Sequence, residues 1–132
     1  MNKSEIIHEF LATVFDNTLF ADLRKIMSFE QGLDFGIIIL VCSGIELIGA
    51  LDHGRLVDSK KRFQEALENY FPDRYKRYKE TLYKRFRCGL AHQAFIKPGT
   101  ATARNPNYKE YHLWGVVVEG NDLLFIHPDV FA

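Results

Sequence analysis

The sequence has few of the residues that stabilise small secreted or metal-dependent domains. Its 132 residues include only two cysteines, Cys42 and Cys88. They do not form a C-x-x-C pair, so neither a disulfide scaffold nor a zinc site is predicted. A chain of this length buries a core without such help. We therefore expect one domain over residues 1–132 in a reducing compartment, with no metal and no cofactor.

The chain also lacks a net charge, because 17 Lys and Arg residues balance 17 Asp and Glu residues. No overall field therefore draws it toward nucleic acid or an anionic membrane. Its one long apolar stretch, residues 35–51, is short for a membrane span and contains Glu46, which favours a buried core helix. The N-terminus begins an amphipathic helix without a signal-peptide pattern. These features predict a cytoplasmic protein with no membrane contact.

The zero net charge hides a basic region in the middle of the chain. Residues 58–87 carry ten Lys or Arg and five acids, whereas residues 1–57 carry four and eight. Such cations hold an RNA backbone without any base contact, and Arg85, Lys76 and Arg77 are the expected RNA-binding residues. The alternative is an ordinary solvated helix surface.

Apolar spacing predicts four helices, with Ser4 as the cap of the first and Pro72 between the third and the fourth. The second helix is apolar on most sides, so we expect it at the centre. The predicted fold class is mainly α, with a four- to five-helix bundle over residues 1–95. The four helices cover residues 4–27, 30–53, 58–71 and 73–91.

After the fourth helix the composition changes to turn-forming and strand-forming residues. We expect a short strand at residues 94–97 and a loop over 98–107. Residues 111–118 and 123–126 are rich in aromatic and β-branched residues and predict a small antiparallel β-hairpin around a Gly-Asn turn. This C-terminal part, residues 96–132, extends the bundle. His112 and His127 are expected on the hairpin surface.

The end of the fourth helix carries the segment Arg87-Cys88-Gly89-Leu90-Ala91-His92. On an ideal helix Arg87 and His92 are about 140 degrees apart, so they diverge unless the helix unwinds near Gly89 or the Arg bends across. Cys88 and Ala91 are small and allow a second helix to approach closely. This predicts a homodimer through the motif face, which brings two Arg and two His side chains together.

The segment resembles the R-x4-6-H signature of HEPN domains, and RFRCGLAHQ is similar to the version in small bacterial HEPN-like proteins. The resemblance covers residues 1–95. It implies a dimeric, metal-independent endoribonuclease of a defence or toxin-antitoxin system, with RNA as substrate and a cognate antitoxin or partner protein. In that chemistry Arg87 stabilises the scissile phosphate, and His92 exchanges protons as the ribose 2′-OH attacks to form a cyclic phosphate.

Glu46, Cys88 and Lys84 are the expected supporting residues. HEPN proteins place an acidic or polar residue on an earlier helix beside the motif, so we expect Glu46 to pair with Arg87. A buried carboxylate needs a partner in any case, so a purely structural salt bridge predicts the same contact. Many active members have Asn, Asp or His where this chain has Cys88, a poor hydrogen bonder. Packing and a nucleophilic role are the alternatives for its thiol.

Two other functions compete with the nuclease. One is a non-catalytic HEPN-like module in which the same residues hold a dimer together, bind a nucleotide or bind a partner protein. The other is a regulatory fragment whose residues 128–132 pack on a neighbour. The aromatic residues of the third and fourth helices either stack on single-stranded bases or pack the two helices together. They are Tyr70, Phe71, Tyr75, Tyr78 and Tyr83.

Overall fold

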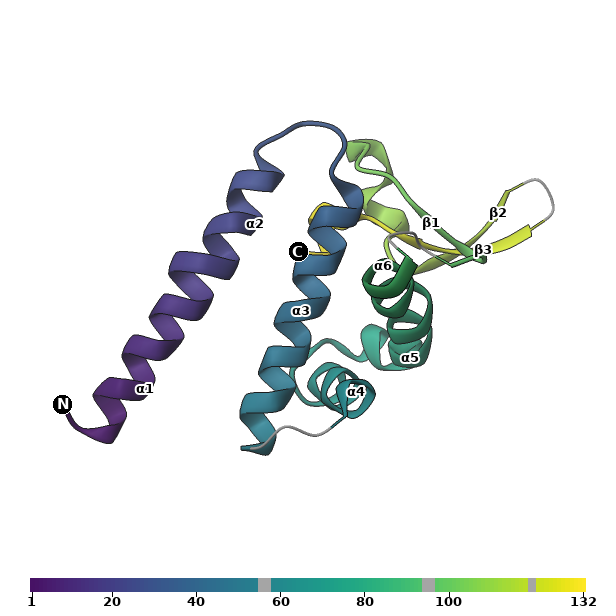
Figure 1. Cartoon of the computed structure of the whole chain (residues 1–132). Coiled ribbons are helices and arrows are strands. Elements are labelled where there is room, and N and C mark those ends of the chain that lie inside the picture. Colours follow the sequence, from purple (N-terminus) through teal and green to yellow (C-terminus); the bar gives the residue numbers. More distant parts are fainter. Residues whose placement is uncertain (55–57, 94–96, 119–120) are drawn as a thin grey trace.

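The computed structural model describes residues 1–54, 58–93, 97–118 and 121–132, without the side chains of residues 92, 93, 116–118, 121 and 122. The protein is mainly helical and has a small three-stranded sheet near its C-terminus, as predicted (Figure 1). A long N-terminal helix lies on one side of α3 (Asp34–His53), the helices of residues 59–93 and the sheet lie on the other side, and the C-terminus lies between α3 and the N-terminal helix in this view (Figure 1).

The first helix is continuous over the predicted range but contains a π-helical segment. It consists of α1 (Lys3–Leu11), the π-helical η1 (Ala12–Leu19) and α2 (Phe20–Met27). Its cap is Asn2, not Ser4: the Asn2 side chain accepts from the Glu5 N–H, and the Glu5 carboxylate accepts from the Asn2 N–H. This reciprocal capping box satisfies two backbone donors at the helix end.

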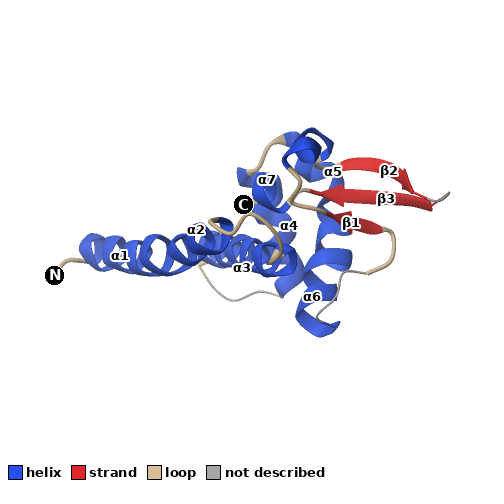
Figure 2. Cartoon of the chain, turned by 90° about the horizontal axis from the view of Figure 1, so that it is seen from above, coloured by secondary structure: helices blue, strands red, loops and turns tan. Residues whose placement is uncertain are grey.

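The two halves of the first helix differ in burial. In α2 Leu23 is buried, and in η1 Leu19 packs on Gly44 of α3. In contrast, α1 has no buried residue and leans away from α3, extending past the other elements when seen from above (Figures 1 and 2). Its apolar residues Ile6 and Phe10 are 52% and 45% exposed. The spacing of the apolar residues correctly predicted a helix here, but these residues are not buried in α1.

The central position predicted for the second helix is correct, although α3 begins at Asp34 because the residues before it form a loop. Within the described residues, α3 is long and apolar enough to cross a membrane by length and composition alone. A core helix of a water-soluble protein passes the same test, and here α2, α4, η2 and α7 all contact α3. Its most deeply buried side chains are Ile37, Ile38, Cys42 and Ile45.

Helix α4 (Ser59–Tyr70) begins at the cap Asp58, whose carboxylate accepts from the Lys61 N–H, and ends before Pro72. It crosses α3 at Gly49. A Cβ at Gly49 would lie 2.1 Å from the backbone oxygen of Arg62, so only glycine permits this approach. The close crossing buries Phe63 and Leu67 against α3.

The predicted fourth helix is also continuous and again contains a π-helical segment. It comprises α5 (Asp73–Thr81), the π-helical η2 (Leu82–Arg87) and α6 (Cys88–Gln93). Leu82, Phe86 and Leu90 are buried on one face, as the sequence predicted. This face attaches the helix to the core and directs the neighbouring Arg87 toward α3.

The C-terminal part forms a sheet in the order β1-β3-β2. Strands β2 (Trp114–Val118) and β3 (Asn121–Ile126) pair antiparallel, which confirms the predicted hairpin. Residues 119 and 120 of its turn lie outside the described residues, as do 94–96 of the strand expected at 94–97. The sequence missed β1 (Thr100–Thr102), which pairs parallel with β3, and the 3-10 helix η3 (Pro106–Tyr111).

Two expectations for this part of the chain were wrong. His112 and His127 are not on the surface: they are 2% and 0% exposed. The C-terminal residues form α7 (Pro128–Phe131), which packs on α3 with Phe131 buried, so they belong to the core of this chain and not to a contact with a neighbour.

Arg104 joins the connection between α2 and α3 to the C-terminal helix α7. Its Nε donates to Asp129 Oδ1 at 3.0 Å, Nη1 to the Gly32 oxygen at 2.8 Å and Nη2 to the Met27 oxygen at 3.1 Å. Met27 is the last residue of α2, so the cation also satisfies a carbonyl at the negative end of that helix. A buried charge is retained here because three acceptors surround it.

The close crossing at Gly49 predicts a specific loss of stability. Gly49→Ala should lower the free energy of unfolding by about 2 kcal/mol or more, because the new methyl group overlaps the Arg62 backbone. The matched control is Gly36→Ala in the same helix, where nothing lies within 4 Å of the new Cβ. It should be neutral or raise stability by roughly 0.5–1 kcal/mol. Urea unfolding measures both, and equal effects of the two substitutions would contradict the crossing.

Candidate functional site

The candidate site is built on an ion pair between α3 and η2. Arg87 Nε lies 2.8 Å from Glu46 Oε1, and Arg87 Nη2 donates to Glu46 Oε2 at 3.2 Å. The two side chains are 18% and 16% exposed. The predicted contact between Glu46 and Arg87 is therefore present, with the carboxylate on one edge of the guanidinium.

The ion pair keeps Arg87 charged. Burial lowers the pKa of Arg87, but the hydrogen bond and the charge of Glu46 raise it by more, so the pKa lies above its usual value. The Arg87 guanidinium also lies 5.6 Å from the centre of the Tyr83 ring, which adds a cation–π contact. Glu46 and Tyr83 together fix the orientation of the guanidinium.

One edge of this guanidinium is not occupied by Glu46. The carboxylate lies along the Nε and Nη2 edge, and among the described residues the Cys88 thiol is a further hydrogen-bonding neighbour of the guanidinium. An arginine has two edges with paired N–H donors, and either one can bind a carboxylate or a phosphate with two hydrogen bonds. Arg87 therefore retains an edge with the geometry that binds a phosphate group.

The helix is distorted up to the first residue of the motif. The π-helical η2 ends at Arg87 and Cys88–Gln93 is α-helix, so the helix does not unwind at Gly89, which was one of the two ways considered for bringing Arg87 and His92 together. Such π-helical turns are often found at functional sites. The structure places the backbone of His92 in the last turn of α6, but its side chain lies outside the described residues.

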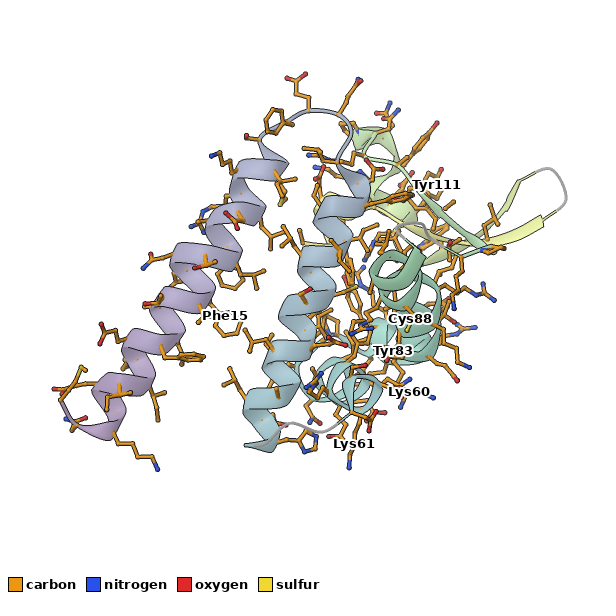
Figure 3. All side chains as sticks on the ribbon, viewed as in Figure 1. Phe15, Lys60, Lys61, Tyr83, Cys88 and Tyr111 are labelled. Atoms are coloured by element: carbon orange, nitrogen blue, oxygen red, sulfur yellow. The ribbon has the colours of Figure 1, made fainter. Side chains whose placement is uncertain are left out.

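In Figure 3 the labelled side chains Cys88 and Tyr83 lie near each other on this helix. Lys60 and Lys61 of α4 lie beyond Tyr83 in the same view. The Tyr83 hydroxyl lies 2.6 Å from Ser59 Oγ at the start of α4, which links the site to that helix. The Cys88 thiol interacts with both Tyr83 and Arg87. Partial burial and Cys88 raise the pKa of Tyr83, and the hydrogen bond to Ser59 opposes them.

Cys42 lies one helical turn before Glu46 on α3 and is completely buried. Burial raises the pKa of its thiol, and the Glu46 carboxylate raises it further, against the opposing effect of Arg87. A thiol in this environment stays protonated and is not a nucleophile. Cys42 therefore contributes packing beneath the ion pair.

The other cations named from the sequence have separate roles. Lys84 pairs with Glu80 at 2.8 Å and Lys76 with Asp73 at 2.7 Å, both as exposed pairs on one helix. Arg85 donates to the Gly99 oxygen at 3.0 Å and so attaches the loop before β1 to η2. Arg77 lies over the Tyr78 ring and makes no ion pair within the described residues. The structure does not bring these four cations together with Arg87.

A second polar cluster, around His112, was not predicted from the sequence. His112 Nδ1 accepts the His127 N–H at 3.2 Å, and its Nε2 lies 2.9 Å from the Tyr75 hydroxyl. His127 in turn contacts the Asn105 backbone oxygen at 3.0 Å. Because Nδ1 is an acceptor, the neutral ring carries its proton on Nε2 and donates it to Tyr75. Burial, with additional effects of Arg74 and His127, lowers the pKa of His112 to about 4.

No protein-family model, no curated protein and no solved structure matches this chain. Among the described residues, no group of three His, Cys, Asp or Glu side chains is placed to hold a metal ion. The site is therefore described by its own residues: an oriented arginine at a helix distortion, a carboxylate partner and a histidine one turn farther along.

The ion pair predicts a strong energetic coupling. Glu46→Gln and Arg87→Gln should each lower the free energy of unfolding by about 1–3 kcal/mol, because each leaves a mostly buried charge without its partner. The double variant should lose less than the sum. A double-mutant cycle by urea unfolding measures the coupling. The exposed pair of Glu80 and Lys84 on the same helix is the control and should show no measurable coupling, so equal coupling in both cycles would contradict the assigned burial.

His112 predicts a loss of stability in mild acid. Its folded-state pKa, about 4, lies below the unfolded value of 6.5, so the unfolded chain binds more protons between these values. The contribution of His112 to the free energy of unfolding is complete above about pH 6.5 and decreases as the pH drops toward 4. At pH 5 the free energy of unfolding is lower by about 2 kcal/mol than at neutral pH. His112→Gln should remove this dependence, whereas His8→Gln on the exposed α1 should keep it. An unchanged slope in His112→Gln would contradict the assignment.

Proposed function

We propose that the protein is an HEPN-like, metal-independent endoribonuclease of a defence or toxin-antitoxin system that acts as a dimer in the cytoplasm. The observation that carries the proposal is the orientation of Arg87, whose Nε and Nη2 edge is held by Glu46 so that the carboxylate does not occupy the other edge. This edge suits a scissile phosphate. The position of His92 on the same helix end adds an imidazole, the side chain that most often acts as a general acid or base.

In the proposed reaction the ribose 2′-oxygen attacks phosphorus, and the bond from phosphorus to the 5′-oxygen breaks. A His92 side chain accepts the 2′-OH proton, and a His92 side chain donates a proton to the leaving 5′-oxygen. The products are a 2′,3′-cyclic phosphate and a 5′-hydroxyl end. Arg87 stabilises the negative charge that develops on the phosphate oxygens, while Glu46 keeps the guanidinium in place.

A dimer supplies the two histidines that this scheme uses. Cys88 and Ala91 are small residues at the surface of the motif, where a second helix can approach. A two-fold axis beside α6 places both motifs at one site. We propose this face as the homodimer interface, and a cognate antitoxin or other partner protein as the ligand that regulates it.

A second candidate function is a non-catalytic HEPN-like interaction module. The observation that favours it is the same ion pair, because neutralising the Glu46 carboxylate is by itself a structural reason for Arg87 to be there. Cys88, in the place of the Asn, Asp or His of many active members, removes a hydrogen-bonding group from the motif. In this function Arg87 and His92 support an interface or bind a nucleotide or partner protein.

The nuclease proposal predicts cleavage of single-stranded RNA in the presence of a chelator. Arg87→Ala should lower the rate by about 10²-fold or more and His92→Ala by about 10²–10⁴-fold, because each removes transition-state stabilisation or proton transfer. Matched controls of the same residue types are Arg24→Ala and His8→Ala on the first helix. Gel analysis of end-labelled RNA, with detection of the cyclic phosphate, measures the rates.

The outcome separates the two candidate functions. Intact RNA after incubation with dimeric wild-type protein, together with a large drop in melting temperature in both motif variants, rejects the nuclease and supports the interaction module. Cleavage that persists in Arg87→Ala also rejects the assigned mechanism. Loss of cleavage with an unchanged melting temperature supports the nuclease.

A further inference from the structure

A hollow of about 380 Å³ lies between α5 and the start of β2. It is formed by Arg74, Arg77 and Tyr78 of α5 and by the segment His112 to Gly115, and none of its lining residues is acidic. Arg77 and Arg87 are ten residues apart on one continuous helix, about 15 Å along its axis. The hollow is therefore separate from the site of Glu46 and Arg87.

Arg74 and Arg77 form a pair of cations that no carboxylate of the described residues neutralises. They are three positions apart on α5 and so share a helix face. Neither makes an ion pair in the described part of the chain, whereas Lys76 between them pairs with Asp73. Each guanidinium is restrained by the adjacent aromatic ring, Arg74 at 5.3 Å from the Tyr75 ring centre and Arg77 at 5.6 Å from that of Tyr78. Two oriented guanidiniums without a carboxylate partner among the described residues suit a phosphate group.

Trp114 supplies a flat aromatic surface at the same hollow. It is 56% exposed and is the single tryptophan of the sequence. A T-shaped contact with Tyr111, at 5.5 Å between ring centres, restrains the indole. Any nucleobase can stack on an exposed aromatic side chain of this kind, whatever the nucleotide sequence.

The backbone before Trp114 is strained. Leu113 is buried and has a φ of 63°, in the left-handed region that a leucine rarely adopts. This conformation lets the chain bury His112 on one side of Leu113 and expose Trp114 on the other. Strain of this kind is found at binding sites, where the surrounding structure maintains it.

We propose that this hollow binds a nucleotide unit, with the base stacked on Trp114 and the phosphate held by Arg74 and Arg77. Both His112 nitrogens are engaged inside the protein, so the two guanidiniums are the charged groups that face the ligand. The volume is near the small end of the range for small-molecule sites, which fits one nucleotide. The inference goes beyond the proposed nuclease and does not depend on RNA cleavage.

The ligand has two sources with the same chemistry: a free nucleotide or one unit of a single-stranded RNA. Trp114 allows a direct test, because tryptophan fluorescence of the whole chain comes from this residue alone. The probes are AMP, adenosine, inorganic phosphate and a short oligoadenylate. We expect a saturable change of Trp114 fluorescence with AMP, with the oligoadenylate or with both. Adenosine and phosphate alone should bind at least tenfold more weakly, since each lacks one of the two contacts.

Charge variants test the arginines. Arg74→Gln and Arg77→Gln should each weaken binding by about tenfold, because each removes a charged hydrogen-bonding partner of the phosphate. Arg24→Gln on the first helix is the matched control of the same residue type and should keep the wild-type affinity, since Arg24 is exposed and does not line the hollow. All three residues are exposed, so circular dichroism should show intact folding.

The outcomes separate the alternatives. Saturation by AMP alone assigns a free nucleotide, and preference for the oligoadenylate assigns a single strand. The proposal is overturned if neither probe changes the fluorescence, or if Arg24→Gln loses as much affinity as Arg77→Gln. It is also overturned if Trp114 fluorescence changes only with protein concentration, because the hollow is then a contact between protein molecules.

Discussion

The burial of α3 is the constraint on which the rest of this structure depends. The helix is apolar on nearly every side, so other elements must cover it: α2 and α7, α4 at the close crossing over Gly49, and η2 with α6. Glu46 is the carboxylate in the middle of this apolar helix and must find a cation. Arg87 is that cation, so the orientation of the candidate phosphate-binding group follows from a requirement of the core.

The sequence was sufficient for the helices and for this ion pair. Apolar spacing depends on local periodicity, and Pro72 and Gly54 mark ends that need no knowledge of distant residues. The contact between Glu46 and Arg87 was predictable because a carboxylate in an apolar helix needs a partner, and the resemblance of the motif to HEPN domains implied that the partner is Arg87. The position of the helix distortion could not be predicted, because the sequence of η2 contains no clear signal for a π-helical turn.

The features that the sequence missed all depend on contacts far along the chain. Strand β1 has three residues and exists only because β3 lies beside it in parallel. From the sequence, His112 and His127 were expected on the surface of a hairpin. They can be buried because the Tyr75 hydroxyl and the Asn105 backbone oxygen are hydrogen-bond partners of their ring nitrogens. Arg74 and Arg77 resemble the other cations of a solvated helix, and only the fold places Trp114 next to them.

The contrast between α1 and α2 implies that the long N-terminal helix does not unfold as one unit. Leu23 and the Arg104 hydrogen bond to Met27 attach its C-terminal end to the core. In the structure of the described residues, α1 (Lys3–Leu11) has a capping box at Asn2 but no buried side chain. A helix segment this short is marginal without tertiary contacts. Local opening free energy therefore declines along the helix toward Lys3, and the first turns exchange their amide protons independently of global unfolding.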